Sequence, residues 1–336
     1  MTLPAPAGVS PAAPAASPAG GGGVRLKLEH VRALLVVNPT ATTTTARSRE
    51  VLKRALASEL KVEVVETSHR GHAAALAVRA MREGLDVVVA LGGDGTVNEV
   101  VNGLLTDGPH HDLPALAVVP GGSTNVFARA IGLPIHPFDA TGAILEALRA
   151  GRSRRVGLGL ADDRYFTFNA GLGFDADVVR RIERRRKAGE QPSHARFVRA
   201  SIGHYFTVDH RHPALTLERP GEDPVDHLHF ALVTNTAPWS YLGQRPVQPS
   251  PEASFDTGLD VFAPRSMGIG LTLRYVRRAL LGAAPLRSRR LLRVHDLADF
   301  TLRASRPLAL QVDGDWLGER DAVRFRSVPD VLRVIV

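Results

Sequence analysis

The sequence predicts an α/β domain with a mostly parallel sheet, followed by a second, mainly antiparallel β domain. Strand-like and helix-like stretches alternate between residues 31 and 150, which is typical of parallel sheets covered by helices. After residue 151, short stretches of alternating polarity follow one another with turn residues between them, as in antiparallel sheets. A length of 336 residues also favours two domains over one.

Apolar, β-branched runs and helical spacing define the elements of the first half. The predicted strands are 31–37, 62–67, 86–91 and 115–119, and the predicted helices are 46–59, 71–84, 97–105, 126–131 and 137–150. Ligands bind such sheets at the carboxyl ends of the strands. The loops that follow these four strands are rich in Gly, Thr, Ser or Asn, so we expect a nucleotide site there.

The second half combines short strands with two basic helical segments. Residues 180–211 hold nine Arg or Lys against three acids, and residues 274–293 hold seven Arg and no acid. A basic amphipathic helix suits an anionic membrane surface. An arginine-rich solvated face over an ordinary core face is the alternative for each helix alone. The predicted strands are 154–160, 164–169, 214–218, 227–234, 259–262, 291–297, 299–304, 308–312 and 331–336.

Residues 1–24 are predicted to be a disordered tail, because seventeen of the 24 are Pro, Ala or Gly and none is charged. The tail lacks the features of a secretory signal, and no later stretch reaches the roughly 18 apolar residues of a spanning helix. We therefore expect domains at 25–150 and 151–336 that are soluble or lie on a membrane surface. The net charge of +8 favours anionic partners, and the absence of Cys excludes disulfides and a thiol nucleophile.

The most informative stretch is 91–100, Leu-Gly-Gly-Asp-Gly-Thr-Val-Asn-Glu-Val. Its glycines end a strand and let backbone N–H groups approach a ligand closely. A strand, a glycine turn and a helix N-terminus together favour a phosphate, since unpaired N–H groups and the helix dipole attract an anion. Asp94 would repel a bare phosphate, so we expect it to hold a metal ion, a hydroxyl or a positioned water. An ordinary βα turn with a solvated Asp is the alternative for this motif alone.

Two further stretches carry weaker signals. The run 171–176 fits the dinucleotide pattern G-x-G-x-x-A, but its antiparallel neighbours do not provide the βαβ unit that this pattern requires. Asp313-Gly314 after an apolar strand indicates a hairpin. Asp313 and Asp315 also offer two carboxylates that could divide the work of accepting a proton and holding a metal or nucleotide.

In combination, these motifs resemble the diacylglycerol kinase catalytic-domain family, the bacterial lipid kinases related to sphingosine kinases. The run 92–100 is the most specific match. The likeness extends over residues 31–336 and keeps the order of the family's motifs. The further matching segments are 38–39, Thr67 with 71–73, 120–129 (family pattern PxGTxNDFAR), 169–176 (NxxGxGFDA) and 313–315 (DGE).

The resemblance implies an N-terminal domain like that of phosphofructokinases and NAD kinases, a C-terminal β-sandwich, and ATP between them. Asp313 would take the proton from the lipid hydroxyl, and the sphingosine-kinase relatives leave Asp94 as a partner or alternative in that role. Phosphoryl transfer then needs mainly positioning and charge neutralisation by Mg²⁺. The residues implied to bind ATP are Asn38, Pro39, Thr40, Thr42, Thr67, Gly92, Gly93, Asp94, Gly95, Thr96, Asn98, Ser123 and Asp315.

Several positions depart from the family's pattern. Val126 stands where diacylglycerol kinases commonly have Asp, and Asp315 stands where they have Glu. Bacterial relatives usually hold a structural Mg²⁺ with an Asp-Gly-Leu run. Here Thr257 directly precedes Gly258, which makes Asp256 the candidate metal ligand from one position earlier.

The sequence thus predicts a cytoplasmic, ATP- and Mg²⁺-dependent lipid kinase at the inner face of the membrane, with diacylglycerol as its first expected substrate. Lipid and anionic head groups are the expected partners, nucleic acid is not expected, and a homodimer is left open. The alternatives are a sphingoid-base or other lipid kinase and a soluble-substrate kinase such as NAD kinase. A non-catalytic nucleotide-sensing or nucleic-acid-binding protein comes last, because no nucleic-acid module is recognisable.

Overall fold

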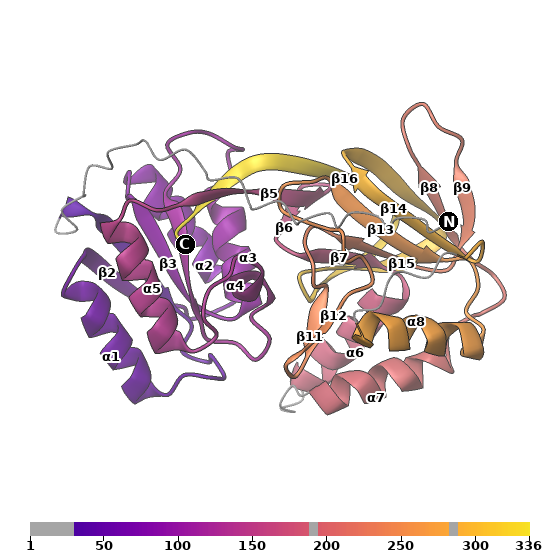
Figure 1. Cartoon of the computed structure of the whole chain (residues 1–336), viewed down its shortest axis with the longest axis horizontal. Coiled ribbons are helices and arrows are strands. Elements are labelled where there is room, and N and C mark those ends of the chain that lie inside the picture. The colour runs from indigo at the N-terminus through magenta and orange to yellow at the C-terminus, as the bar shows by residue number, and fades with distance from the viewer. Residues whose placement is uncertain (1–29, 188–193, 282–287) are drawn as a thin grey trace, which may run out of the picture.

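The computed structural model describes residues 30–187, 194–281 and 288–336 (Figure 1). The tail predicted at 1–24 lies outside these residues. An α/β half and a strand-rich half stand side by side in Figure 1, which confirms the predicted fold class.

Four parallel strands form the sheet of the N-terminal half, in the order β2-β1-β3-β4. In register, Val37 lies opposite Leu91, and Leu91 lies opposite Val119. The strands therefore end together, and the loops that follow them share one edge of the sheet. The strands are β1 (Arg32–Val37), β2 (Lys61–Glu66), β3 (Val87–Gly92) and β4 (Ala115–Pro120).

Helices cover both faces of this sheet, because successive side chains of a strand point to opposite faces. Leu34 and Val36 of β1 pack on one face with residues of α2, α3 and α4. Leu35 and Val37 pack on the other face with residues of α1 and α5. The helices are α1 (Ala46–Ala57), α2 (His72–Arg82), α3 (Asp94–Leu104), α4 (Val126–Ala130) and α5 (Pro137–Arg149).

The strand-rich half encloses its own core, in which Phe300 and Phe325 stack and Phe166 meets Phe325 edge-on. Helices α6 to α8 lie beneath its strands in Figure 1. Its elements are β5 (Arg154–Ala161), β6 (Arg164–Phe166), β7 (Asn169–Leu172), α6 (Phe174–Lys187), α7 (His194–Tyr205), β8 (Leu215–Glu218), β9 (Val225–Leu228), β10 (Ala231–Thr234), β11 (Ser240–Leu242), β12 (Arg245–Val247), β13 (Leu259–Pro264), α8 (Ile269–Leu281), β14 (Leu291–Leu297), β15 (Asp299–Val312) and β16 (Asp315–Val334).

The hairpin signal at Asp313-Gly314 is confirmed, since β15 and β16 pair antiparallel with Val312 opposite Asp315. Both turn residues have positive φ, of 48° and 83°. The expected strands 299–304 and 308–312 are one strand, β15, and most of β16 was not predicted. Glu319, Arg320 and Asp321 are exposed at successive positions, which interrupts the alternation that marks a strand.

The last strand returns to the first domain, which the prediction of a continuous domain at 151–336 did not foresee. Val334 of β16 pairs parallel with Leu116 of β4, and Ile335 lies in the core beneath the parallel sheet. The two halves therefore share one continuous sheet, and β16 links the carboxyl-terminal hairpin to the α/β domain.

Other boundaries also differ from expectation. The stretch expected as one strand at 227–234 contains the end of β9 and all of β10. The basic segment 180–211 holds two helices, α6 and α7, and the first begins earlier, at Phe174. In the second basic segment, α8 begins at Ile269. Within the described residues, no helix is long and apolar enough to cross a membrane.

Candidate active site

Two glycine turns lie back to back at the edge where the parallel strands end. A Cβ on Gly122 would come within 2.7 Å of the Gly93 Cα, and one on Gly121 would come within 3.1 Å of the Gly92 Cα. The Gly121 amide also donates a hydrogen bond of 2.7 Å to the Gly92 carbonyl. Glycine is required here because any side chain would force the β3–α3 and β4–α4 turns apart.

The loop after β1 is tied to the same turns. Asn38 Nδ2 donates to Thr96 Oγ1 at 3.1 Å, and the Asn38 Oδ1 accepts from both the amide and the hydroxyl of Thr40. The Thr43 amide donates to the Gly121 carbonyl at 3.1 Å. Three of the four predicted loops are therefore one hydrogen-bonded unit.

The remaining residues predicted to bind ATP line the same edge. Thr67 directly follows β2 and donates its amide to the Val37 carbonyl at 2.8 Å. A Cβ on Gly95 would meet nothing within 4 Å, so the first turn of α3 faces open space. Thr42 and Ser123 are exposed in their loops, and Pro39 is half-buried.

The Asp313 carboxylate enters this edge from the β15–β16 hairpin and is saturated with donors. Its Oδ2 accepts from Asn98 Nδ2 at 2.8 Å, from the Thr167 amide at 2.7 Å and from the Thr167 hydroxyl at 2.8 Å. Its Oδ1 accepts from the amides of Phe168 and Asn169 at 3.0 and 3.1 Å. Burial raises the pKa of Asp313, and these hydrogen bonds oppose that rise.

Asp94 has a different environment. It is half-buried at the first turn of α3, and its Oδ1 accepts from the Phe127 amide at 3.2 Å, at the start of α4. Burial raises the pKa of Asp94 to about 6, against the lowering effect of the α4 amides. The charge of Asp313 adds to this rise in the pKa of Asp94.

Arginines surround the carboxylates. Arg164 donates from Nη2 to the Asn98 Oδ1, and Arg70 pairs with Asp315 at 3.2 Å and with Glu183 at 3.3 Å. Burial raises the pKa of Asp315, whereas the charges of Arg70 and Arg164 lower it. The site thus combines backbone N–H groups and cations, which bind phosphate, with carboxylates, which bind a cation or accept a proton.

The dinucleotide-like run 171–176 has a structural role instead. A Cβ on Gly171 would come within 2.6 Å of Asp175 Oδ2, so the glycine makes room for this buried carboxylate. Gln311 Nε2 donates to Asp175 Oδ2 at 2.7 Å and to Asn169 Oδ1 at 2.8 Å. Burial raises the pKa of Asp175 to about 7. This network supports the segment that holds Asp313.

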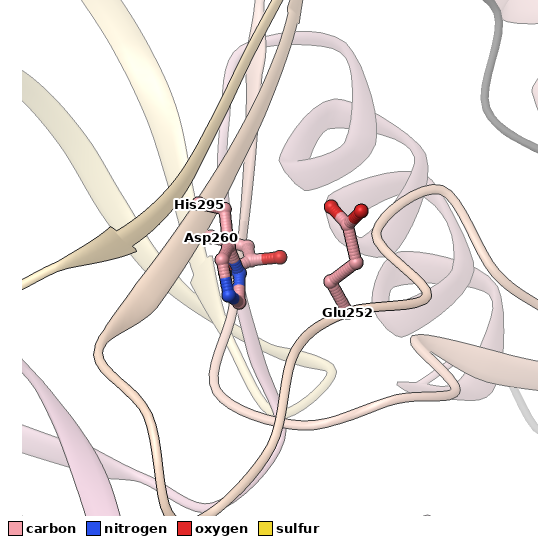
Figure 2. A group of neighbouring side chains, drawn as sticks. All are labelled: Glu252, Asp260 and His295. Atoms are coloured by element: carbon pink, nitrogen blue, oxygen red, sulfur yellow. The ribbon is translucent and has the colours of Figure 1, made fainter.

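The predicted metal ligand Asp256 lies in the segment that leads into β13. It is exposed, and its Oδ2 pairs with Arg154 Nη2 at 2.6 Å, an arrangement that does not fit a bound cation. Figure 2 shows a different group, Glu252, Asp260 and His295, whose candidate ligand atoms lie within 4.8 Å of one another. His295 Nδ1 already pairs with Asp260 at 2.7 Å, and Glu252 with Arg293 at 3.5 Å. Protein partners thus account for all three side chains.

Sequence reasoning missed the residues that hold Asp313. Arg164 and Thr167 carry no motif, and they reach Asp313 or its partner Asn98 only through pairing of distant strands. Glu99 was also missed. Its carboxylate accepts from the amides of Gly71 and Ala73 at 2.9 and 3.2 Å, and so caps α2. Glu99 lies 28 residues from Gly71, so no local sequence pattern signals this contact.

The fold and these loops define an α/β domain with glycine-rich turns at its strand ends, joined to a strand-rich half. Two crystal structures from Bacillus anthracis str. Sterne share this fold. One has a TM-score of 0.72 at 21% identity, and the other, described as a diacylglycerol kinase, has a TM-score of 0.66 at 20% identity. Each comparison covers 90% of this chain and 96% of the other.

Residues 32–161 match the family model described as the diacylglycerol kinase catalytic domain. Proteins named diacylglycerol kinase from Staphylococcus aureus strains JH9 and Newman are 37% identical to this chain over 143 residues. The match spans 40% of this chain and 41% of each of these curated relatives. Residues 32–161 thus resemble the diacylglycerol kinase catalytic domain, and the resemblance predicted from the motifs is confirmed for this part of the chain.

Proposed function

We propose that this protein is an ATP-dependent lipid kinase that phosphorylates the hydroxyl of diacylglycerol and so forms phosphatidic acid. One observation carries the proposal: the glycine turns of the catalytic domain face the buried Asp313 of the other half, across Asn98. Backbone donors for phosphate and carboxylates for proton transfer thus meet at one place, as phosphoryl transfer requires. The names of the curated relatives support diacylglycerol as the substrate class.

ATP would lie along the strand ends. The open first turn of α3 at Gly95 and the loop at Thr40 and Ser123 offer N–H and hydroxyl groups to the phosphates. A Mg²⁺ that accompanies ATP would neutralise phosphate charge. Arg164 and Arg70 would contribute further positive charge near Asp315.

The hydrogen bonds favour Asp94 over Asp313 as the proton acceptor. Asp313 accepts five hydrogen bonds, so its lone pairs are committed to the β6–β7 segment and to Asn98. Asp94 is less committed, and a pKa of about 6 leaves it ionised at neutral pH while keeping it more basic than an ordinary Asp. Asp313 would then position Asn98 and the segment 167–169.

We further propose that the protein works as a peripheral protein at the inner face of the membrane, where its substrate lies. Its net charge of +8 and the basic segments around α6 to α8 support attraction to anionic head groups. This arrangement would deliver the lipid hydroxyl to the site without removing the acyl chains from the bilayer.

The test is transfer of the ATP γ-phosphate to lipids in mixed micelles. The lanes contain diacylglycerol, monoacylglycerol, sphingosine, ceramide, and NAD without lipid. A labelled phosphatidic acid band that disappears in Asp94→Asn is the expected result. Labelling of sphingosine or ceramide instead would show that the substrate is that lipid and not diacylglycerol. Labelling of NAD would overturn the lipid-kinase proposal.

A further inference from the structure

Helix α8 turns an apolar stripe towards solvent. Ile269, Leu273 and Val276 are 56%, 64% and 50% exposed, and their spacing of four and three residues places them on one face. A different face of α8 packs against the protein. There, the centroid of the Tyr275 ring lies 5.9 Å from that of the Phe262 ring. Large apolar side chains gathered on an exposed face are unfavourable in water, so the stripe indicates a contact surface.

Two arginines lie along one side of this stripe. Arg274 and Arg277 are exposed, and the helix contains no Asp or Glu. At 3.6 residues per turn, they lie on the order of 100° to one side of the stripe. An interfacial helix has this arrangement when it lies flat on a bilayer, with its apolar face among the acyl chains and its guanidinium groups at the lipid phosphates.

A second patch adjoins the start of α8. The Tyr205 hydroxyl donates to the Met267 carbonyl and so joins the end of α7 to the segment that leads into α8. Ile202 and Phe206 at that end of α7 are exposed apolar residues. Between α6 and α7 lies a groove of about 510 Å³ that is lined by Arg181, Arg184, Arg199, Ala200, Ile202 and Gly203. Its guanidinium groups add to the positive charge of this side.

The surface is joined to the candidate active site through one hairpin. The Gln248 amide, just after β12, donates to the Ala279 carbonyl of α8 at 3.0 Å. On the other side of the hairpin, the Arg129 guanidinium of α4 lies over the Tyr241 ring, 4.0 Å from its centroid. Because the Phe127 amide of α4 also donates to Asp94, three short contacts connect α8 to the site.

We propose that the outward face of α8, together with the end of α7, is the surface by which this protein docks on an anionic lipid bilayer. The biological purpose of this docking rests on the proposed lipid-kinase function. A bilayer fits because it offers acyl chains to the stripe and phosphates to the arginines. A second copy that presented the same face would bring arginines against arginines, which disfavours a symmetric dimer.

The test uses the full-length protein without nucleotide, sedimented with vesicles of phosphatidylcholine alone or mixed equally with phosphatidylglycerol. The test variant is Val276→Asp. Its matched control is Val51→Asp on α1, where the side chain is 48% exposed. We expect Val276→Asp to weaken binding to the mixed vesicles at least tenfold and Val51→Asp to leave binding unchanged. Arg274→Gln with Arg277→Gln should reduce the preference for phosphatidylglycerol and its salt sensitivity, whereas Arg47→Gln on α1 should not.

Other results would overturn the proposal that this face of α8 docks on a bilayer. Equal binding by the two Asp variants, or no binding by the wild type, would do so. So would a dimer that Val276→Asp converts to a monomer in light scattering while vesicle binding persists. Because no ATP is present, these results are independent of the kinase proposal. If the surface serves catalysis, Val276→Asp should phosphorylate a monomeric short-chain diacylglycerol at the wild-type rate and lose activity only on vesicles.

Discussion

Asn98 of α3 donates a hydrogen bond of 2.8 Å to Asp313, which lies 215 residues later in the chain. This contact joins the glycine motif of the first domain to the hairpin of the second. The same Asn98 side chain also donates to the Tyr165 carbonyl at 3.0 Å and accepts from Arg164. One buried amide therefore holds the two halves of the candidate active site in register.

The rate of phosphoryl transfer should depend on the ionisation of Asp94. Because burial raises the pKa of Asp94 to about 6, we expect kcat/KM to rise with pH below about 6 and to level off above it. Steady-state rates between pH 5 and 8 measure this profile. Asp175, whose pKa burial raises to about 7, is the other group that could produce this pH dependence of kcat/KM. A midpoint that shifts in Asp175→Asn would assign the profile to that residue instead.

Asp313→Asn should damage both folding and turnover. The amides of Thr167, Phe168 and Asn169 converge on both carboxylate oxygens, so an amide NH₂ would face donors in either orientation. We expect a loss of about 2–4 kcal/mol in the free energy of unfolding, measured in urea. Asp139→Asn on the exposed side of α5 is the control. An Asp313→Asn variant of wild-type stability would contradict this account of the carboxylate.

Stability should fall as the pH rises through the weakly acidic range. Burial raises the folded-state pKa of Asp94 to about 6 and of Asp175 to about 7, so between about pH 4 and these values the folded chain keeps protons that the unfolded chain has released. The stabilisation from these bound protons is complete below about pH 4 and is lost as the pH rises through about 6 and 7. Urea unfolding at several pH values measures this pH dependence of the free energy of unfolding. Asp175→Asn should make the dependence weaker between about pH 6 and 7. A curve that Asp94→Asn and Asp175→Asn both leave unchanged would refute the assignment.

Gly122→Ala should impair the nucleotide loops without unfolding the domain. The added Cβ would lie 2.7 Å from the Gly93 Cα and 3.0 Å from Asn125 Oδ1, so the two glycine turns must separate. We expect the KM for ATP to rise at least tenfold, about 1.4 kcal/mol or more of lost binding. Gly142→Ala in α5, where a Cβ meets nothing within 4 Å, is the matched control and should be neutral or slightly stabilising. An unchanged KM in Gly122→Ala would show that the turns do not cradle the nucleotide.

Local patterns predicted the parts of the site that are continuous in sequence. The buried run of β3, the glycine turn after it and the Asp313-Gly314 hairpin are each encoded within a few residues. Parallel strands that end together bring Asn38 and Gly121 to one edge, so the shared position of these loops also followed from the pattern. These features depend on backbone geometry, which neighbouring residues largely set.

The tertiary structure decided which side chains meet. The donors of Thr167 and Asn169 reach Asp313 only because β7 pairs with β15, and pairing between distant strands leaves no local signal. The same is true of Val334, which returns the last strand to Leu116. The sequence by itself determined the two kinds of sheet, the four loops and an amphipathic, arginine-rich α8. Packing alone decided which carboxylate has all its oxygens occupied by hydrogen-bond donors. It also decided which face of α8 is exposed to solvent, because both features depend on groups far away in the chain.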